Sequence, residues 1–285
     1  MLFRSNAQQP ANAKFQEQAA RQTQIYESRG ADVPAGYVIG RGLAAYASAL
    51  PPQFDQDLAK LPESARWLDI GAGEGQAILD YHNAASPVRK ASAVAMSIED
   101  RRTQLWHDTA TRLGENKLRY LYGKSLNDYT LAELGRFQVI SDLLGGFSYT
   151  RDVSRYMEKT LSFLEVGGSF YSILQDVHSE EGSNAPHYRD RGASYLTEIA
   201  STPDGKMKMC TWLKHISCVQ VTCELKPRWT PPVEVYQVTK TCDNVIVPRL
   251  TLTQFTAGTP PERRYRLEPD NAEAPLAKKI GRAHV

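Results

Sequence analysis

Between residues 65 and 174, short apolar runs alternate regularly with longer amphipathic segments. We predict five strands from the apolar runs, at 65–70, 91–96, 118–122, 137–144 and 168–174. The segments between them repeat apolar residues at the spacing of an α-helix. Strands joined by helical crossovers favour a parallel sheet covered by helices on both faces. Right-handed crossovers make such a sheet doubly wound.

The clearest helical pattern lies at 150–168, just before the fifth predicted strand. Its apolar stripe follows the i, i+3, i+4, i+7 spacing of a helix face that is buried against a core. The stripe consists of Val153, Tyr156, Met157, Thr160, Leu161 and Leu164. The glycine pair Gly167-Gly168 is typical of a tight helix end, so we expect the helix to stop there.

Beyond residue 205 the pattern changes to three apolar runs with short connections, at 213–225, 233–240 and 244–255. Short connections favour antiparallel pairing. We therefore predict a doubly wound, mostly parallel, seven-stranded α/β sheet with helices on both faces and antiparallel strands at its C-terminal edge. The alternative is that the last strands form a separate β-subdomain.

Three regions follow from this organisation. We expect an N-terminal helical extension or cap over 1–60, the main domain over 61–256 and a tail over 257–285. The basic cluster PERRYR at 261–266 is interpreted as a solvated part of that tail. The last six residues, IGRAHV, match the translation of a common sequencing adapter, so we interpret them as an artefact and leave them out of the fold.

Charge and cysteine usage limit the classes of function. The formal net charge is +2, which gives no long-range attraction to nucleic acid or to a membrane surface. Four cysteines occur, at Cys210, Cys218, Cys223 and Cys242, and their spacing is not that of a zinc site. We expect reduced thiols and no bound metal. No apolar run approaches a membrane span of roughly 18 residues, so we expect a cytoplasmic protein.

The stretch DIGAGEG follows the first predicted strand and carries the strongest functional signal. In an open α/β sheet, ligands bind beyond the carboxyl ends of the strands, where helix N-termini also offer free N–H groups. Gly71, Gly73 and Gly75 read G-x-G-x-G. A dinucleotide-binding fingerprint reads G-x-G-x-x-G, and Gln76 stands where its third glycine would be. Asp69 precedes them, and a carboxylate suits an ammonium group better than a pyrophosphate.

With its preceding residues, WLDIGAGEG resembles the first motif of the class I S-adenosylmethionine-dependent methyltransferases. The resemblance in order and spacing covers roughly residues 65–175. It implies a Rossmann-like methyltransferase fold and S-adenosyl-L-methionine as the cofactor. It also implies that Asp69 holds the amino-acid end of the cofactor. The residues that would line this part of the site are Gly71, Ala72, Gly73 and Gly75.

The second and third strands depart from the family pattern. Aligning AVAMSIED with the family puts Ala95 where an acid usually binds the ribose hydroxyls. Ser97 or Glu99 could bind the ribose instead, or Glu99 could simply be a first-turn acid that the helix dipole stabilises. After the third strand, Lys124 stands where the family often has an acid, and Ser125 could face the adenine.

The fourth strand ends in ISDLLGGFSYT. The resemblance implies that Asp142 and Leu143, at its carboxyl end, face the cofactor and the substrate. The alternative is that this acid belongs to a helix N-cap signal, a role that Thr150 or Asp152 could also fill. Tyr149 is either a wall of the substrate pocket or an aromatic residue on the rim of the sheet.

Methyl transfer from a sulfonium is an in-line displacement in which the protein mainly aligns the reactants. A general base is optional, and no catalytic residue can be assigned. His178, near Asp176, and His187 lie in a region, 175–191, that could form a substrate lid. Arg41 is either a partner of the cofactor carboxylate or part of a surface salt bridge.

The sequence therefore predicts a methyltransferase whose acceptor is a small molecule, with a protein side chain as the second choice. No nucleic-acid or membrane partner is indicated, and the oligomeric state cannot be read. Two alternatives are a non-catalytic binding protein with a methyltransferase-like domain and, less favoured by Asp69 and Gln76, a dinucleotide-dependent oxidoreductase.

Overall fold

The computed structural model of the chain describes residues 41–83, 90–175, 177–179, 193–201, 205–226, 233–257 and 260–269. Its helices are α2 (Leu43–Ala49), α3 (Gln53–Lys60), α4 (Gln76–Asn83), α5 (Gln104–Leu113), η2 (Leu126–Asp128), α6 (Leu131–Leu134), α7 (Gly146–Tyr149), α8 (Val153–Phe163) and α9 (Met209–Lys214). None of the helices in these ranges has both the length and the apolar character needed to span a membrane.

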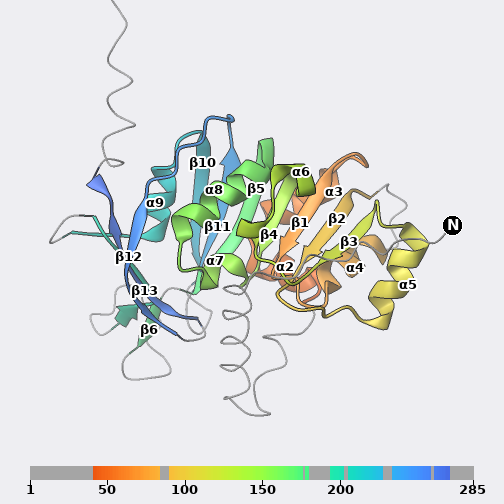
Figure 1. The fold of residues 1–285 in the computed structure, drawn as a ribbon, viewed down its shortest axis with the longest axis horizontal. Helices are drawn as coiled ribbons and strands as arrows, with labels where there is room; N and C mark the ends of the chain where they lie inside the picture. Colours follow the sequence, from red (N-terminus) through yellow and green to blue (C-terminus); the bar gives the residue numbers. More distant parts are fainter. Residues whose placement is uncertain are drawn as a thin grey trace, which may run out of the picture.

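The main sheet has seven strands in the order β10-β11-β5-β4-β1-β2-β3 (Figure 1). They are β1 (Arg66–Ile70), β2 (Ser92–Met96), β3 (Leu118–Leu121), β4 (Phe137–Asp142), β5 (Leu164–Gln175), β10 (Val219–Lys226) and β11 (Val233–Lys240). β1 to β5 pair in parallel, whereas β11 runs antiparallel to both β5 and β10. The predicted fold class is therefore confirmed.

Each face of this sheet carries its own hydrophobic core. On one face, α2 to α5 pack through residues such as Phe54, Ile78 and Trp106. On the other, α8 and α9 pack through residues such as Met157 and Trp212. β1 and β2 are buried along four of their five residues, as expected for strands covered on both faces.

Helix α8 follows the predicted stripe but ends earlier than expected. Val153, Tyr156, Met157, Thr160 and Leu161 are all buried, and Asp152 caps the helix by accepting a hydrogen bond from the Arg155 N–H. The helix stops at Phe163, so the predicted end at the glycine pair is wrong. Gly167 and Gly168 lie inside β5, next to a register shift in its pairing with β4. Gly167 has a φ of +88°, which places it in the left-handed region.

A second sheet has the strand order β12-β13-β8-β9. Its strands are β8 (Thr197–Ala200), β9 (Lys206–Met207), β12 (Leu250–Thr256) and β13 (Glu262–Leu267), and β6 (Val177–Ser179) pairs separately with β7 (Ala193–Tyr195). The second sheet joins the core on the α8 face through Ile199, Leu250 and Tyr265. The third C-terminal run thus leaves the main sheet, and the β-subdomain alternative applies to it.

The expected solvated tail is also corrected by the second sheet. Residues 262–267 form β13, which pairs with β12 and β8. Arg263, in the middle of the basic cluster, has no exposed surface. A short basic sequence gives no sign of burial, because the partners that make burial possible come from distant segments. The expected artefact at the end of the chain lies outside the described residues, as does the segment before residue 41.

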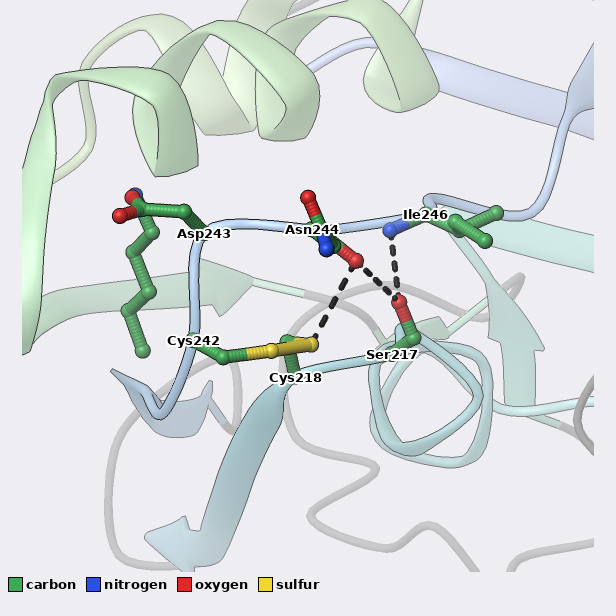
Figure 2. The surroundings of a disulfide bond; sticks show 7 residues. Ser217, Cys218, Cys242, Asp243, Asn244 and Ile246 are labelled. Carbon is green, nitrogen blue, oxygen red and sulfur yellow. Dashed lines mark hydrogen bonds and ion pairs between the residues drawn. A yellow bond between two sulfur atoms is a disulfide. The ribbon is translucent and has the colours of Figure 1, made fainter. Parts of the chain in front are cut away.

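The four cysteines form two disulfides, so the expectation of reduced thiols is wrong. Cys210 and Cys223 join α9 to β10, and Cys218 and Cys242 join the segments that flank β10 and β11. Antiparallel pairing of Val219 with Lys240 brings the second pair together. Around it, the Ser217 Oγ donates to the Asn244 carbonyl at 3.2 Å and accepts from the Ile246 N–H at 2.7 Å (Figure 2).

Candidate functional site

The glycine loop lies at the point where the chain reverses its direction of winding through the sheet. β1 pairs with β2 on one side and with β4 on the other. In doubly wound sheets the crevice outside the carboxyl ends of such strands is the usual ligand site. Residues 71–75 occupy this place and connect β1 to α4.

Packing within the protein explains two of the three glycines. Gly71 has a φ of +73°, and a Cβ there would lie 2.6 Å from the Gly145 Cα in the loop after β4. Gly75 has a φ of +76°, and a Cβ there would lie 2.3 Å from the ring of Trp106. These positions need glycine to let two loops and a helix come together. Gly73, with a φ of +56°, is therefore the glycine at which we place ligand approach.

Asp69 is at the centre of a buried hydrogen-bond network. Its Oδ2 accepts from the Tyr46 hydroxyl at 2.9 Å, and its Oδ1 accepts from the Ser141 hydroxyl at 2.6 Å. Ser141 in turn accepts from the Trp67 indole N–H at 2.9 Å. Burial raises the pKa of Asp69 to about 7, while the hydrogen bonds from Ser141 and Tyr46 act in the opposite direction. The network fixes α2 to β1 and β4.

This geometry differs from the direct ligand contact expected for Asp69. The side chain has no exposed surface, and both carboxylate oxygens already have donors. In this structure Asp69 shapes the floor of the loop. The sequence could not show this, because Tyr46 and Ser141 are 23 and 72 residues away along the chain.

Arg41 and Tyr120 hold the loop through its backbone carbonyls. The Arg41 Nη2 donates to the Gly71 carbonyl at 3.1 Å. The Tyr120 hydroxyl donates to the Gly73 carbonyl and lies 3.4 Å from that of Glu99. Tyr120 thereby ties the loop after β1 to the loop after β2. Sequence reasoning did not single out Tyr120, since nothing in its neighbourhood distinguishes it from other strand aromatics.

At the second strand, Ala95 and Ser97 are the two residues nearest the expected ribose position. Ala95 is fully buried inside β2, where it pairs with Asp69 and Tyr120. The strand ends at Met96, so Ser97 is the residue at its tip. Ser97 is partly exposed, as a ligand-binding residue needs to be. The Glu99 carboxylate forms an exposed ion pair with Arg101 at 2.6 Å.

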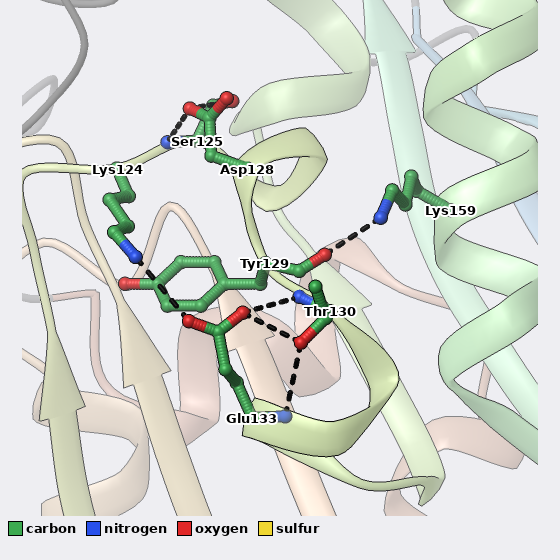
Figure 3. Close-up of polar contacts among 7 residues, drawn as sticks. All are labelled: Lys124, Ser125, Asp128, Tyr129, Thr130, Glu133 and Lys159. Carbon is green, nitrogen blue, oxygen red and sulfur yellow. Dashed lines mark hydrogen bonds and ion pairs between the residues drawn. The ribbon is translucent and has the colours of Figure 1, made fainter.

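The loop after β3 is organised by local capping (Figure 3). The Ser125 hydroxyl and N–H both donate to the Asp128 carboxylate, at 2.9 and 3.2 Å, and together they start η2. The Lys124 ammonium lies 5.0 Å from the centre of the Tyr129 ring and 3.5 Å from Glu133. The Ser125 hydroxyl is therefore already engaged with Asp128, and a hydrogen bond to an adenine would have to form in addition to this one or replace it.

Asp142 holds the loop that follows β4. Its carboxylate accepts from the N–H groups of Gly145 at 2.7 Å and Phe147 at 2.8 Å, and from the Tyr156 hydroxyl. Burial raises the pKa of Asp142 to about 6, although these three hydrogen bonds act in the opposite direction. Because side chains alternate along a strand, Asp142 and Asp69 lie on opposite faces of the sheet. Each one supports the loops at the carboxyl edge from its own face of the sheet.

The residues after Asp142 are held in an unusual conformation. Leu143 is buried, so its side chain belongs to the core. Leu144 has a φ of +57°, which costs a non-glycine residue roughly 1–2 kcal/mol. Strain of this kind is found where a structure holds a loop for function. The strained residue lies where the resemblance places the reactants.

The second sheet also contacts the segment after β4, through Arg263 of β13. The buried Arg263 guanidinium donates to the carbonyls of Phe147 at 2.9 Å and Thr150 at 3.0 Å. It also donates to the Thr197 hydroxyl at 3.0 Å. The one-turn helix α7 is thus bound at its N–H groups by Asp142 and at its carbonyls by Arg263. The link depends on tertiary contacts 113 and 116 residues apart and leaves no local signal.

The predicted lid falls mostly outside the described residues. Asp176 and His187 are not part of them. His178 lies in β6, opposite Ser194 of β7. Tyr149 ends α7 and is partly exposed beside the loop. Its role as a pocket wall stays a prediction.

No protein-family model and no curated protein sequence matches the chain. Solved structures resemble it only distantly. A precorrin-6y C5,15-methyltransferase from Geobacter metallireducens is 12% identical over 65% of this chain and 84% of its own, with a TM-score of 0.36. An rRNA methylase from Streptococcus thermophilus is 13% identical over 67% of this chain and 95% of its own, with a TM-score of 0.39.

A third similar structure is PKMT2 from Rickettsia typhi in complex with AdoHcy. It is 21% identical over 43% of this chain and 24% of its own, with a TM-score of 0.34. The strand order, the single antiparallel strand β11 and the position of the glycine loop define the class of fold. The chain has a doubly wound, Rossmann-like α/β fold.

Proposed function

We propose that the protein is an S-adenosylmethionine-dependent methyltransferase that transfers a methyl group to a small-molecule acceptor. The observation that carries this proposal is the loop D-x-G-x-G-x-G at the carboxyl end of β1, at the switch point of the sheet. The bound cofactor would supply an electrophilic methyl group on a sulfonium with a good leaving group. The protein then has to bind, align and exclude water.

The residues around the loop fit the amino-acid end of this cofactor in part. Gly73 admits a ligand close to the backbone, and the Arg41 guanidinium lies beside it at the Gly71 carbonyl. A guanidinium can bind a carboxylate through two parallel hydrogen bonds. We therefore assign the cofactor carboxylate to Arg41. Ser97, at the tip of β2, is assigned to the ribose.

Asp69 and Asp142 are assigned as positioning residues. Each one fixes a loop at the site through buried hydrogen bonds, and neither presents an exposed oxygen. Tyr46, Tyr120 and Tyr156 complete this support from α2, β3 and α8. The absence of an acid at the ribose position keeps open the alternative of a non-catalytic binding protein.

Calorimetric titration with S-adenosylmethionine, S-adenosylhomocysteine and NAD tests the proposal. We expect both sulfur compounds to bind below about millimolar, which corresponds to roughly 4 kcal/mol of binding free energy, and NAD not to bind. Gly73→Val should abolish this binding, because its side chain fills the ligand's approach. Gly114→Val is the matched control: Gly114 also has a positive φ, with no atom within 4 Å of its Cβ position, at the end of α5.

Two outcomes would redirect the proposal. If neither sulfur compound binds, the assigned function is wrong. If both bind but no methyl group reaches any member of a broad acceptor panel, the non-catalytic alternative is favoured. The cytoplasmic location stays a prediction, and the two disulfides count against it because disulfides persist mainly in oxidising compartments.

A further inference from the structure

A buried carboxylate outside the glycine loop lies near the same edge of the sheet. Glu234 is the second residue of β11 and pairs with Leu174, one residue before the end of β5. Because β11 is antiparallel, its beginning lies beside the carboxyl end of β5. The side chain of Glu234 is 8% exposed. It is therefore close to the ligand-binding edge and almost removed from water.

The pairing register places Glu234 on the same face as the loop after β4. Asp142, Ser172 and Tyr236 are paired in one row across β4, β5 and β11. Glu234 lies two residues from Tyr236 toward the carboxyl edge, so their side chains point to the same face. The rings of Tyr236 and Phe147 are 5.8 Å apart, which connects β11 to α7. Glu234 therefore belongs to the surroundings of α7.

The charge of Glu234 has no counterpart within the described part of the chain. Its Oε2 accepts a hydrogen bond from the Tyr236 hydroxyl at 2.8 Å, and no ion pair with a described Lys, Arg or His is formed. Burying a carboxylate without a cation is costly, so buried charges are normally paired. Arg263, a buried cation near α7, uses its donors on Thr197 and on the Phe147 and Thr150 carbonyls.

We infer that Glu234, held in place by Tyr236, binds a cationic nitrogen of the methyl acceptor. An ammonium or guanidinium group would supply both the missing positive charge and the N–H donors for the remaining lone pairs of the carboxylate. A neutral hydroxyl would supply no charge. The acceptor class is therefore a small molecule with an ammonium or guanidinium group, and Glu234 is its specificity-determining residue.

The spacing of the strands sets how the acceptor lies. β11 is two strands from β4, which is about 10 Å at the usual strand separation. An acceptor whose nitrogen binds Glu234 would therefore need a chain of several bonds between that nitrogen and the atom that reacts beside the β4 loop. That the bound molecule is the methyl acceptor rests on the proposed function, but the binding of a cation at Glu234 can be measured without the cofactor.

The test is a calorimetric titration of the full chain with n-butylammonium and n-butylguanidinium chlorides, and with n-butanol as the uncharged analogue. We expect at least one of the cations to bind at least about tenfold more tightly than butanol. Glu234→Gln should remove this difference. Glu224→Gln, which neutralises an exposed carboxylate on the neighbouring strand β10, should keep it.

Tyr236→Phe is a second variant that keeps the carboxylate and removes only its hydrogen bond. We expect it to weaken cation binding by less than Glu234→Gln does, because it keeps the negative charge. Urea unfolding of Glu234→Gln beside the unchanged chain shows whether the glutamine variant is folded. If neither cation is preferred over butanol, or if Glu234→Gln binds the cations as the unchanged chain does, the inference is wrong. S-adenosylhomocysteine titrated into the same samples gives a separate result. Failure to bind it would overturn the proposed function, whereas the cation preference decides the role of Glu234.

Discussion

Removing the hydroxyl of Tyr46 tests how the site is held together. Tyr46→Phe deletes one of the two donors to the buried Asp69 carboxylate and changes little else in side-chain volume. A hydrogen bond to a charged group contributes roughly 1.5–3 kcal/mol to stability. We therefore expect the free energy of unfolding to fall by about 2 kcal/mol when Asp69 is ionised.

The loss should depend on pH, and the sign follows from the pKa of Asp69. Burial raises this pKa in the folded protein to about 7, above the unfolded value of about 3.9. The stability that Asp69 contributes is thus present below its unfolded pKa and is lost as the pH rises through 7. The Tyr46 hydrogen bond lowers the folded pKa, so Tyr46→Phe raises it further. The difference between the two proteins should therefore grow as the pH rises.

Urea unfolding at about pH 5.5 and about pH 8.5 measures this difference, with wild type compared at each pH. We expect a loss of about 1 kcal/mol at the lower pH and about 2 kcal/mol at the higher one. Tyr81→Phe is the control, because the Tyr81 hydroxyl accepts from the uncharged Ala91 N–H and its loss should not vary with pH. Equal losses for Tyr46→Phe at both pH values would refute the reasoning.

Three further predictions concern packing and covalent structure. Gly71→Ala should lower the free energy of unfolding by at least about 2 kcal/mol, since its Cβ meets the Gly145 backbone, whereas Gly114→Ala should cost only about 1 kcal/mol; urea unfolding of both variants checks this. Arg263→Met should cost roughly 2–4 kcal/mol by leaving two loop carbonyls unpaired, while Arg266→Met, on the exposed side of the same strand, should cost less than about 1 kcal/mol. A smaller loss of unfolding free energy for Arg263→Met than for Arg266→Met would contradict the stabilisation of α7 by Arg263. Thiol titration of the unreduced, denatured protein should find no free cysteine and four after reduction; four before reduction would show that the disulfides do not form.

Much of the main sheet could be predicted from the chain alone, because its strands are covered on both faces. Such strands need continuous apolar runs, and the helices between them need apolar stripes, so the pattern at 65–174 gives both strand number and direction. The glycine loop could be predicted for a similar reason. Gly71, Gly73 and Gly75 all adopt positive φ. Because glycine adopts this conformation without strain, three closely spaced glycines indicate such a turn in the sequence.

Other features could not be predicted, because they arise from contacts between distant segments. Whether the last apolar run joins the main sheet or starts a second one depends on which edge it meets. The burial of Arg263 depends on Thr197 and on the carbonyls of α7. The disulfides depend on the register between β10 and β11.

The sequence by itself determined the doubly wound sheet and the turn after β1. These depend on local preference and on the period of apolar residues. The tertiary structure decided which acids near that turn are buried and hydrogen-bonded within the protein. Asp69 and Asp142 look like ligand-binding carboxylates along the chain, yet both are buried. Asp69 receives its hydrogen bonds from Tyr46 and Ser141, 23 and 72 residues away, whereas Asp142 receives two of its hydrogen bonds from the loop that follows it. Glu234 drew no attention in the sequence, and only antiparallel pairing brings it to the carboxyl edge.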